Sequence, residues 1–550
     1  MSSVPSDRKA ADYVIIGAGS AGCVIANRLS ADPRHTVRLL EAGGSDNHLL
    51  LKMPLAFLKA MFQPGFIWNY RSEPEPNLNG RTLWLPRGRL LGGTSSINGM
   101  FYMRGHSSDF DGWRARGCEG WAYRDVLPYF RRMETSWRGP SEYHGDRGPL
   151  SVVPIDTRRL LHEPLMQSAA AAGFRVSQDL HGETEEGFAR GEVTIDRNGR
   201  RASTSRAYLY PAMARRNLTV ETEALTNKVI LENGRAVGVE YVRHGQVQRV
   251  YADKEVILCA GAYNSPQLLM LSGIGPAQEL RRHGIEAAVD LPGVGANLSE
   301  HARAPVEFVA REPVTFLNEL RLDRVAVSVM RWALFGSGAF ATQINSCNVV
   351  IRTRHDLTRP DVQLMCNPVR MDAKMWFPGL GRRQEHRITS DVVLLHPASR
   401  GRVSLRSADP RESPRIQLNL LSDRDDIATL IRGIQAARSI YATEPQARLT
   451  GRQIRPGSAL SSPAQLETYL RENLAVTQHP VGTCAMGVGP EAVVDPELRV
   501  HGLTGLRVAD ASIMPTVPGG NTNAACIMIG EKASDLILGF TCPPGAPVLP

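Results

Sequence analysis

The stretch Gly17-Ala18-Gly19-Ser20-Ala21-Gly22 decides the fold that this sequence predicts. It follows the apolar run Tyr13-Val14-Ile15-Ile16, which is typical of a buried parallel strand, and it precedes residues 23–29, which favour a helix. A glycine-rich turn between a strand and a helix is the context that dinucleotide binding requires. The first glycine permits the tight turn, the second lets the backbone approach a pyrophosphate, and the third allows close helix–strand packing. The N-terminus of the helix then presents free N–H groups to the phosphates.

A carboxylate follows the second strand candidate. Thr36-Val37-Arg38-Leu39-Leu40 ends at Glu41, about 20 residues beyond the last glycine of the turn, where an acidic side chain accepts hydrogen bonds from ribose hydroxyls. An acid at this position disfavours a ribose that carries a 2′-phosphate. Strand, turn, helix and acid together predict a bound dinucleotide. The turn alone would equally suit a nicotinamide-dependent dehydrogenase.

A second glycine-rich segment, Gly92-Gly93-Thr94-Ser95-Ser96-Ile97-Asn98-Gly99, has the composition of a ligand-binding loop. Its small residues let the backbone come close to a ligand, and its hydroxyl and amide side chains supply hydrogen bonds. A glycine loop without a ligand is the alternative at this point. Residues 71–89, which are rich in Pro, Asn and Arg, are expected to form an extended connection to this loop.

In the rest of the sequence, a segment with the pattern of a separate α+β layer interrupts the segments assigned to the nucleotide-binding domain. We expect strands at 218–231 and 236–241 around an Asn233-Gly234 turn, a buried strand at 255–261, and a helix that Pro266 can start and Gly273 can stop. The α+β layer covers about 301–476, with an alternating segment at 401–405 and a helix at 424–441. A strand at 506–510 and a helix at 524–538 return to the first domain.

Length and composition are those of a two-domain globular protein. The chain has 550 residues, which is too long for one ordinary core. Its residues are 42% hydrophobic and 22% charged, which is typical of a globular protein. No apolar stretch approaches the ~18 residues of a membrane-spanning helix, and the first residues lack the apolar core of a secretory signal. These features predict a cytoplasmic protein.

Cysteine and charge patterns indicate neither metal nor nucleic acid. The eight cysteines lack C-x-x-C spacing, so we expect buried free thiols and no metal site or disulfide framework. The net charge is +9, but the basic residues occur as short pairs, which favours a solvated basic face over nucleic-acid binding. Peripheral contact with an acidic membrane surface stays open, since an electron acceptor could lie there.

Several spaced motifs resemble the glucose–methanol–choline (GMC) oxidoreductase family. Residues 88–102 and 261–275 match its two signature motifs essentially position for position, and shorter matches follow in the family's order at Gly293–Leu298, His479–Thr483 and Val508–Ser512. The resemblance spans about residues 12–540 and is greatest to bacterial choline-dehydrogenase-like FAD-dependent alcohol dehydrogenases.

The resemblance implies an α/β plus α+β fold, in which an FAD-binding Rossmann-like domain is interrupted by a substrate domain with an antiparallel sheet. The FAD-binding domain would comprise residues 10–155, 216–300 and 476–540, the last part with the catalytic residues. The substrate domain would comprise residues 156–215 and 301–475, and 541–550 would form a loosely ordered tail.

The resemblance also implies the residues of the site. His479 matches the catalytic histidine, and Asn521 matches its partner, with Asn523 as a nearby alternative. The FAD-binding residues would be Gly17, Gly19, Ser20, Ala21, Gly22, Glu41, Ala42, Trp68, Arg87, Gly92, Gly93, Thr94, Ser95, Asn98, Gly99, Met100, Val229, Ala260, Gly261, Asp510, Ala511, Thr522 and Asn523. Some family members bind FAD covalently through a His before the Asn of the glycine loop, but Ile97 stands there, so we expect non-covalent FAD.

Alcohol oxidation needs residues of these types. A neutral imidazole, with an ordinary pKa near ~6.5, suits removal of the hydroxyl proton, so the rate should rise as the imidazole loses its proton. Flavin N5 would take the hydride, and Asn521 would donate to the developing alkoxide. We expect a primary aliphatic or aryl alcohol as substrate and oxygen or a quinone as acceptor. Gln478 stands where an aromatic ring would help to enclose a quaternary ammonium, which disfavours choline. The alternatives are a choline dehydrogenase or oxidase and an FAD-containing hydroxynitrile lyase.

Overall fold

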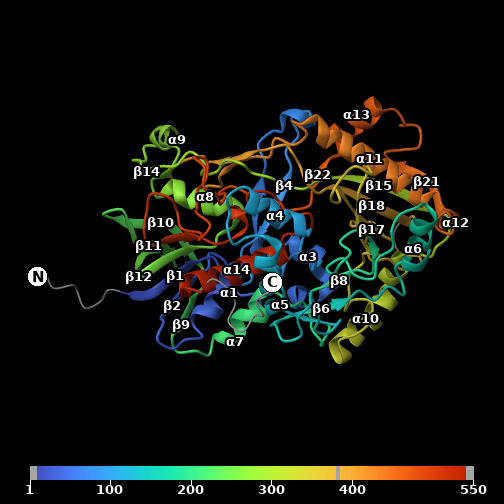
Figure 1. Ribbon diagram of the computed structural model, residues 1–550. Helices are drawn as coiled ribbons and strands as arrows, with labels where there is room; N and C mark the ends of the chain where they lie inside the picture. Colours follow the sequence, from blue (N-terminus) through green and yellow to red (C-terminus); the bar gives the residue numbers. More distant parts are fainter. Residues whose placement is uncertain (1–8, 380–383, 541–550) are drawn as a thin grey trace, which may run out of the picture.

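The computed structural model describes residues 9–379 and 384–540. Figure 1 shows two lobes side by side, one built on the sheet that begins the chain and the other on an antiparallel sheet. The tail predicted at 541–550 and the first eight residues, on which the prediction of no secretory signal rests, lie outside the described residues.

The first sheet contains the strand that precedes the glycine turn. Its strands lie in the order β10-β11-β12-β1-β2-β9, and β23 pairs with β12. The pairs β1–β2, β1–β12, β2–β9 and β12–β23 are parallel, whereas β10 and β11 form an antiparallel edge. The strands are β1 (Ala10–Ile16), β2 (Val37–Leu40), β9 (Leu218–Glu221), β10 (Ala224–Glu232), β11 (Arg235–Arg243), β12 (Gln246–Leu258) and β23 (Leu506–Val508).

The single strand predicted at 218–231 is two strands in the structure. The backbone of Glu223 is left-handed, with φ 57°, and it separates β9 from β10. The following turn is confirmed, because β10 and β11 pair around Asn233 and Gly234, whose φ angles are 50° and 73°. Residues 71–89 also differ from the expected extended connection, since β3 (Ile67–Arg71) and β4 (Trp84–Gly88) pair with each other as antiparallel strands.

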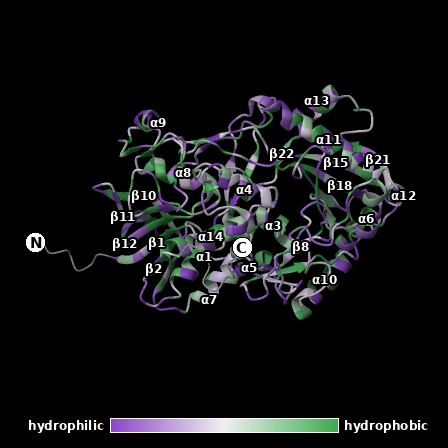
Figure 2. Cartoon of the chain, in the orientation of Figure 1, coloured by the Kyte–Doolittle hydropathy of each residue, from purple (hydrophilic) through white to green (hydrophobic). Residues whose placement is uncertain are grey.

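The last helix of the chain packs against the first. α1 (Ser20–Leu29) and α14 (Asn523–Leu538) approach so closely that a Cβ atom at Gly530 would lie 2.9 Å from the Ala21 carbonyl oxygen. Arg28 pairs with the buried Glu531 of α14 at 2.7 Å. Figure 2 shows mainly hydrophobic residues along β1 and α14. This packing brings the C-terminal segment back to the glycine turn.

The second sheet is antiparallel, as the resemblance implied. Its strands lie in the order β21-β15-β18-β17-β16-β7, and β22 pairs with β15. α11 (Arg424–Tyr441) lies tightly on this sheet, since a Cβ atom at Gly433 would come within 2.4 Å of Val392 Cγ1. The strands are β7 (Gly187–Ala189), β15 (Ala302–Ala310), β16 (Asn348–Ile351), β17 (Val362–Asn367), β18 (Arg387–Leu394), β21 (Thr450–Arg455) and β22 (Ala475–Val476).

Other elements connect and flank the sheets. They include α2 (Leu49–Lys52), α3 (Phe57–Met61), α4 (Ser107–Ala115), α5 (Tyr123–Met133), α6 (His162–Ala171), α7 (Tyr210–Ala212), α9 (Ala277–Arg282), α10 (Leu322–Phe335), α12 (Gln446–Leu449) and α13 (Pro463–Asn473). Short strands are β5 (Glu134–Ser136), β6 (Leu150–Pro154), β8 (Glu192–Val193), β13 (Ile274–Gly275), β14 (Val289–Asp290), β19 (Arg402–Ser404) and β20 (Arg415–Gln417). β6 pairs with β8 across the boundary predicted at residue 155, and the residue boundaries of the domains stay a prediction.

The helix expected to start at Pro266 begins earlier. α8 spans Gly261–Leu271, with the proline inside it. A proline has no N–H to bond the carbonyl four residues before it, which here belongs to Ala262. Thr483 Oγ1 donates to that carbonyl oxygen at 2.6 Å, so the segment that contains His479 stabilises the interrupted helix.

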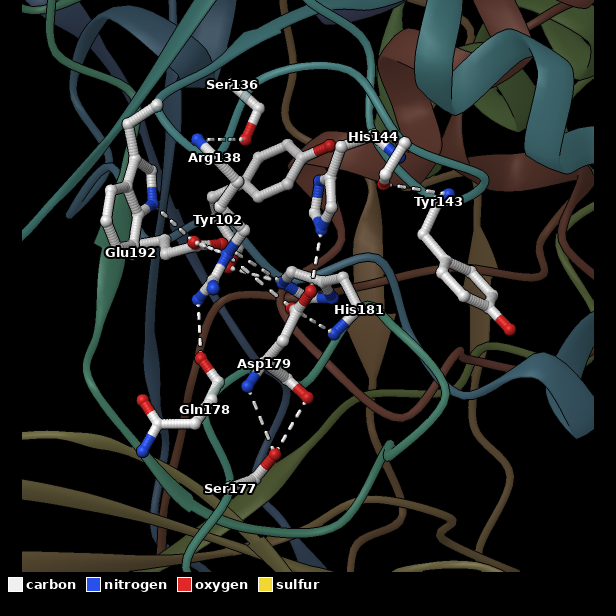
Figure 3. Close-up of polar contacts among 12 residues, drawn as sticks. Tyr102, Ser136, Arg138, Tyr143, His144, Ser177, Gln178, Asp179, His181 and Glu192 are labelled. Carbon is white, nitrogen blue, oxygen red and sulfur yellow. Dashed lines mark hydrogen bonds and ion pairs between the residues drawn. The ribbon is translucent and has the colours of Figure 1, made fainter.

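A buried polar network joins the segment after the glycine loop to Asp179, which lies in the segment between α6 and β7. Glu134 Oε1 accepts from Arg104 Nη2 at 2.7 Å and lies 2.9 Å from His144 Nδ1, and Tyr102 also donates to Glu134. His144 Nε2 lies 2.8 Å from Asp179 Oδ2. Figure 3 shows Tyr102, His144 and Asp179 converging in this network.

We expect protonated His144 to stabilise the fold at acidic and neutral pH. Burial lowers the pKa of His144, but the hydrogen bonds with Asp179 and Glu134 outweigh burial and raise the pKa above its ordinary 6.5. A raised folded-state pKa gives stability that is full below the unfolded pKa and is lost as the pH rises through the folded pKa. His144→Gln should therefore lower the melting temperature more at about pH 6 than at about pH 9. Thermal unfolding of both proteins across this range checks it, and an equal loss at both ends would contradict it.

Candidate functional site

A cavity of 660 Å³ lies between the two sheets and is lined by residues of both lobes. Most of the predicted cofactor residues line it, together with His479 and Asn521. Those in the lining are Gly17, Gly19, Ser20, Ala21, Glu41, Ala42, Trp68, Arg87, Gly93, Thr94, Asn98, Gly99, Met100, Ala260, Gly261, Asp510, Ala511, Thr522 and Asn523.

The two glycine segments meet at one end of the cavity. A Cβ atom at Gly93 would lie 2.8 Å from Gly19 Cα, so the segments touch backbone to backbone. Gly19 caps α1 without a side-chain hydrogen bond, and Gly19, Ser20 and Ala21 all face the cavity. Uncapped N–H groups at a helix N-terminus form an anion site. This end therefore fits a pyrophosphate.

Glu41 lies where a ribose is expected. Its two carboxylate oxygens accept hydrogen bonds from the backbone N–H groups of Ala18 and Gly43, each at 2.8 Å, which fixes the side chain at the end of β2. Burial raises the pKa of Glu41 to about 7, and the two backbone donors oppose this shift. The oriented carboxyl group fits the ribose hydroxyls of a dinucleotide.

Four predicted cofactor residues do not line the cavity. Gly22 packs against the turn itself, since a Cβ atom there would lie 1.9 Å from the Gly17 carbonyl oxygen. Gly92 adopts φ 83° and lies against Ser205, while Ser95 Oγ donates to the Gly92 carbonyl at 2.6 Å. Val229 is buried in β10, and Ala224, Leu225 and Thr226 at the start of that strand line the cavity in its place. No residue pattern in the sequence indicates that β10 begins at Ala224.

Hydrogen bonds determine the tautomer of His479, which lines the same cavity. His301 Nε2 lies 3.0 Å from the Leu395 carbonyl oxygen, which only accepts, so Nε2 carries the proton. The Nδ1 atom of neutral His301 then accepts, and it lies 3.0 Å from His479 Nδ1. The hydrogen-bond partners therefore assign the proton of His479 to Nδ1, and its Nε2 carries a lone pair that can accept a hydrogen bond.

Burial keeps both histidines neutral. Burial lowers the pKa of His479 well below its ordinary value, and the nearby His301 and Arg87 lower it further. Burial also lowers the pKa of His301 to about 3. The imidazole of His479 is thus already an unprotonated base at neutral pH, which differs from the ordinary pKa assumed from the sequence.

Asn521 is the amide that faces His479. Its Nδ2 donates to His479 Nε2 at 3.2 Å, and its Oδ1 accepts from Gln363 Nε2 at 3.4 Å, which orients the amide. Asn523 lies apart from this pair, because its Oδ1 accepts from Ser20 Oγ at 2.8 Å at the N-terminus of α1. The structure therefore places Asn521, and not Asn523, beside the histidine.

Several supporting residues were missed by the sequence analysis. Thr477 Oγ1 lies 2.9 Å from His479 Nδ1, and Glu300 Oε1 accepts from the His479 backbone N–H at 2.6 Å. Burial raises the pKa of Glu300 to about 8, against the opposing charge of Arg87. Glu300 and His301 stand two and three residues after the motif noted at Gly293–Leu298, and this closeness was the available signal.

The fold and the cavity together define a class of protein: a dinucleotide-binding oxidoreductase whose cofactor cavity is also lined by His479 and Asn521. Comparison with protein families confirms it, because the N- and C-terminal models of GMC oxidoreductase match residues 11–303 and 397–530. The chain belongs to the GMC oxidoreductase family.

Known proteins similar to this chain are oxidoreductases. It is 43% identical over 533 residues, 96% of each chain, to an oxygen-dependent choline dehydrogenase of Brucella canis. It resembles the structure of pyridoxine 4-oxidase from Mesorbium loti, with a TM-score of 0.85, 30% identity and coverage of 95% and 98% of the two chains. It also resembles a formate oxidase of Aspergillus oryzae RIB40 studied for FAD modification, with a TM-score of 0.90, 27% identity and coverage of 97% and 99%.

These findings confirm the predicted family, the fold class, the FAD cofactor and an enzyme that acts on CH–OH donors. Family membership excludes the nicotinamide-dependent alternative. Among the described residues, no helix is both long and apolar enough to span a membrane.

We expect FAD to leave the protein on denaturation. Ile97 lines the cavity at the position before Asn98, and its hydrocarbon side chain offers no nucleophile to the flavin. Acid precipitation of the purified protein should leave the yellow colour in the supernatant. Yellow colour that stays with the precipitated polypeptide would contradict the prediction.

Proposed function

We propose that this enzyme oxidises a primary aliphatic or aryl alcohol to the aldehyde with FAD. The observation that carries the proposal is the lone pair of His479 Nε2, which accepts a hydrogen bond from Asn521 Nδ2 at 3.2 Å, in a cavity that both residues line. A neutral base and an amide donor next to one another suit a hydroxyl group that loses its proton while negative charge develops on its oxygen.

The residues proposed to hold FAD line the same cavity as His479. The N-terminus of α1 would hold the pyrophosphate, Glu41 the ribose, and the loop from Gly93 to Met100 the inner part of the cofactor. When bound, FAD supplies the acceptor for the carbinol hydride. The chain's own task is to position the alcohol and to manage its proton.

The tautomer of His479 determines which of its nitrogens can accept the hydroxyl proton. His479 Nε2 takes the hydroxyl proton, while Nδ1–H stays directed at His301 Nδ1, so that the ring does not rotate away from the substrate. In the free site an N–H of Asn521 donates to His479 Nε2. The substrate hydroxyl would replace it at Nε2, and Asn521 would then donate to the substrate oxygen. Gln363 holds the amide so that it donates on this side.

Choline is the second candidate substrate, because the Brucella relative carries that name at 43% identity. The other names differ, since one refers to pyridoxine and one to formate. Gln478, which stands where an aromatic ring would help to enclose choline, instead binds Arg87: its carbonyl oxygen and Oε1 accept hydrogen bonds from Arg87, both at 2.8 Å. We propose oxygen as the electron acceptor on the strength of the relative's name, with a quinone as the alternative.

Turnover in air tests the proposal. Purified enzyme should consume oxygen and release an aldehyde and hydrogen peroxide when it is given primary alcohols from a panel that includes choline. Aldehyde formation that needs an added quinone would move the proposal from oxygen to the quinone. Cyanohydrin cleavage without oxygen uptake would favour the hydroxynitrile lyase instead.

A further inference from the structure

One ion pair lies on the substrate-domain wall of the cavity. Arg303 of β15 and Asp391 of β18 both line the cavity, and Arg303 Nη1 donates to Asp391 Oδ2 at 2.6 Å. Arg303 lies opposite Val393 in the antiparallel pair, so Asp391, two residues away, is its diagonal neighbour on the same face of the sheet. The pair is therefore built into the sheet that covers the cavity.

The pair lies at the catalytic end. Arg303 Nε donates to the Val476 carbonyl oxygen at 3.2 Å, and β22, which contains Val476, leads directly into His479. β22 also pairs with β15 at Ala302. An alcohol whose hydroxyl contacts His479 would therefore extend its tail past these two charges.

Both side chains remain partly open to the cavity. The Arg303 side chain is 32% exposed and that of Asp391 is 13% exposed. Within the described residues, Arg303 Nη2 and Asp391 Oδ1 make no hydrogen bond to the protein. A substrate tail can thus contact both a cation and an anion whose charges already compensate each other.

Other charges on this side give no free carboxylate for a cationic substrate. Asp372, which lines the cavity, is held by Arg370 through both of its oxygens. Arg87 adds a positive charge, and its nitrogens donate to the carbonyls of Pro86 and Gln478 and to the Gln478 side chain. A quaternary ammonium would lose hydration here without gaining an unpaired anion.

We infer that the Arg303–Asp391 pair selects alcohols with an uncharged tail and rejects quaternary-ammonium alcohols such as choline. This inference rests on the proposed alcohol oxidation. A charged tail of either sign meets one charge that repels it and loses its own hydration for an opposite charge that is already paired, whereas an uncharged tail has no charge of its own to desolvate. The apolar lining residues Phe101, Ile344 and Met365 suit an uncharged tail as well.

Opposite variants of the pair test the inference. The substrates are choline, its uncharged isostere in which a quaternary carbon replaces the nitrogen, and an ω-hydroxycarboxylate of similar length. Wild-type kcat/KM should favour the isostere over choline about tenfold or more. Arg303→Gln leaves Asp391 unpaired and should shift this ratio toward choline by about tenfold, whereas Asp391→Asn should shift it toward the hydroxycarboxylate.

Matched controls separate the outcomes. Ratios of kcat/KM within one variant cancel differences in FAD content, and the double variant Arg303→Gln/Asp391→Asn should restore the preference for the isostere. A wild type that prefers choline, or single variants whose ratios do not move, would overturn the inference. If no alcohol reduces the wild-type flavin, the proposed function itself fails.

Discussion

His479→Ala should slow anaerobic reduction of the bound flavin by an alcohol by about 10²–10⁴-fold, the usual cost of losing a positioned base. The imidazole of His479 is neutral, and its Nε2 is the proposed acceptor of the hydroxyl proton. The variant loses this acceptor. FAD content should stay near that of the wild type, because the side chain of His479 contacts none of the groups proposed to hold the pyrophosphate or the ribose. Rapid mixing with alcohol under anaerobic conditions measures the rate.

The pH dependence of the flavin reduction rate distinguishes a base from a residue with only a structural role. Because burial places the pKa of His479 well below 6.5, the wild-type reduction rate should fall only in acid and stay level above neutral pH. This differs from the rise across neutral pH expected for an unperturbed imidazole. A near-normal rate in His479→Ala would contradict the role of the base, and His479→Gln provides a second variant that retains a polar side chain.

Asn521→Ala should slow flavin reduction by about 10²–10³-fold, as expected for losing one donor to a developing oxyanion. The amide is oriented by Gln363 and lies 3.2 Å from His479 Nε2, so its loss removes the donor and leaves the base in place. The same rapid-mixing experiment measures the effect, and the FAD content of the purified variant is read from its absorbance.

The matched control is Asn523→Ala. Asn523 contacts Ser20 at the N-terminus of α1, so its loss should weaken FAD binding more than it slows reduction of the FAD that remains bound. If Asn523→Ala slows reduction and Asn521→Ala does not, the assignment is wrong by two residues.

Local signals made the nucleotide end of the site predictable. The glycine turn, the strand that ends at Glu41 and the second glycine loop each lie within a short segment, and the structure brings all three to one cavity. Val229, by contrast, does not line the cavity. The start of β10 is set by the break at Glu223, whose left-handed backbone the residue type does not indicate.

The part of the site around His479 depends on pairing between strands that lie far apart in the sequence. His301 and His479 lie 178 residues apart and meet only because β22 pairs with β15 in the second sheet. The Arg303–Asp391 pair depends likewise on the β15–β18 register. A motif identified His479, but its tautomer and its lowered pKa follow from neighbours that only the folded chain brings together.

The most direct test of alcohol oxidation at this site is anaerobic mixing of the purified yellow protein with a primary alcohol that has an uncharged tail. The account predicts that the flavin loses its yellow colour and that an equimolar amount of aldehyde appears. A flavin that stays oxidised with every alcohol, or aldehyde that forms without bleaching, would contradict it.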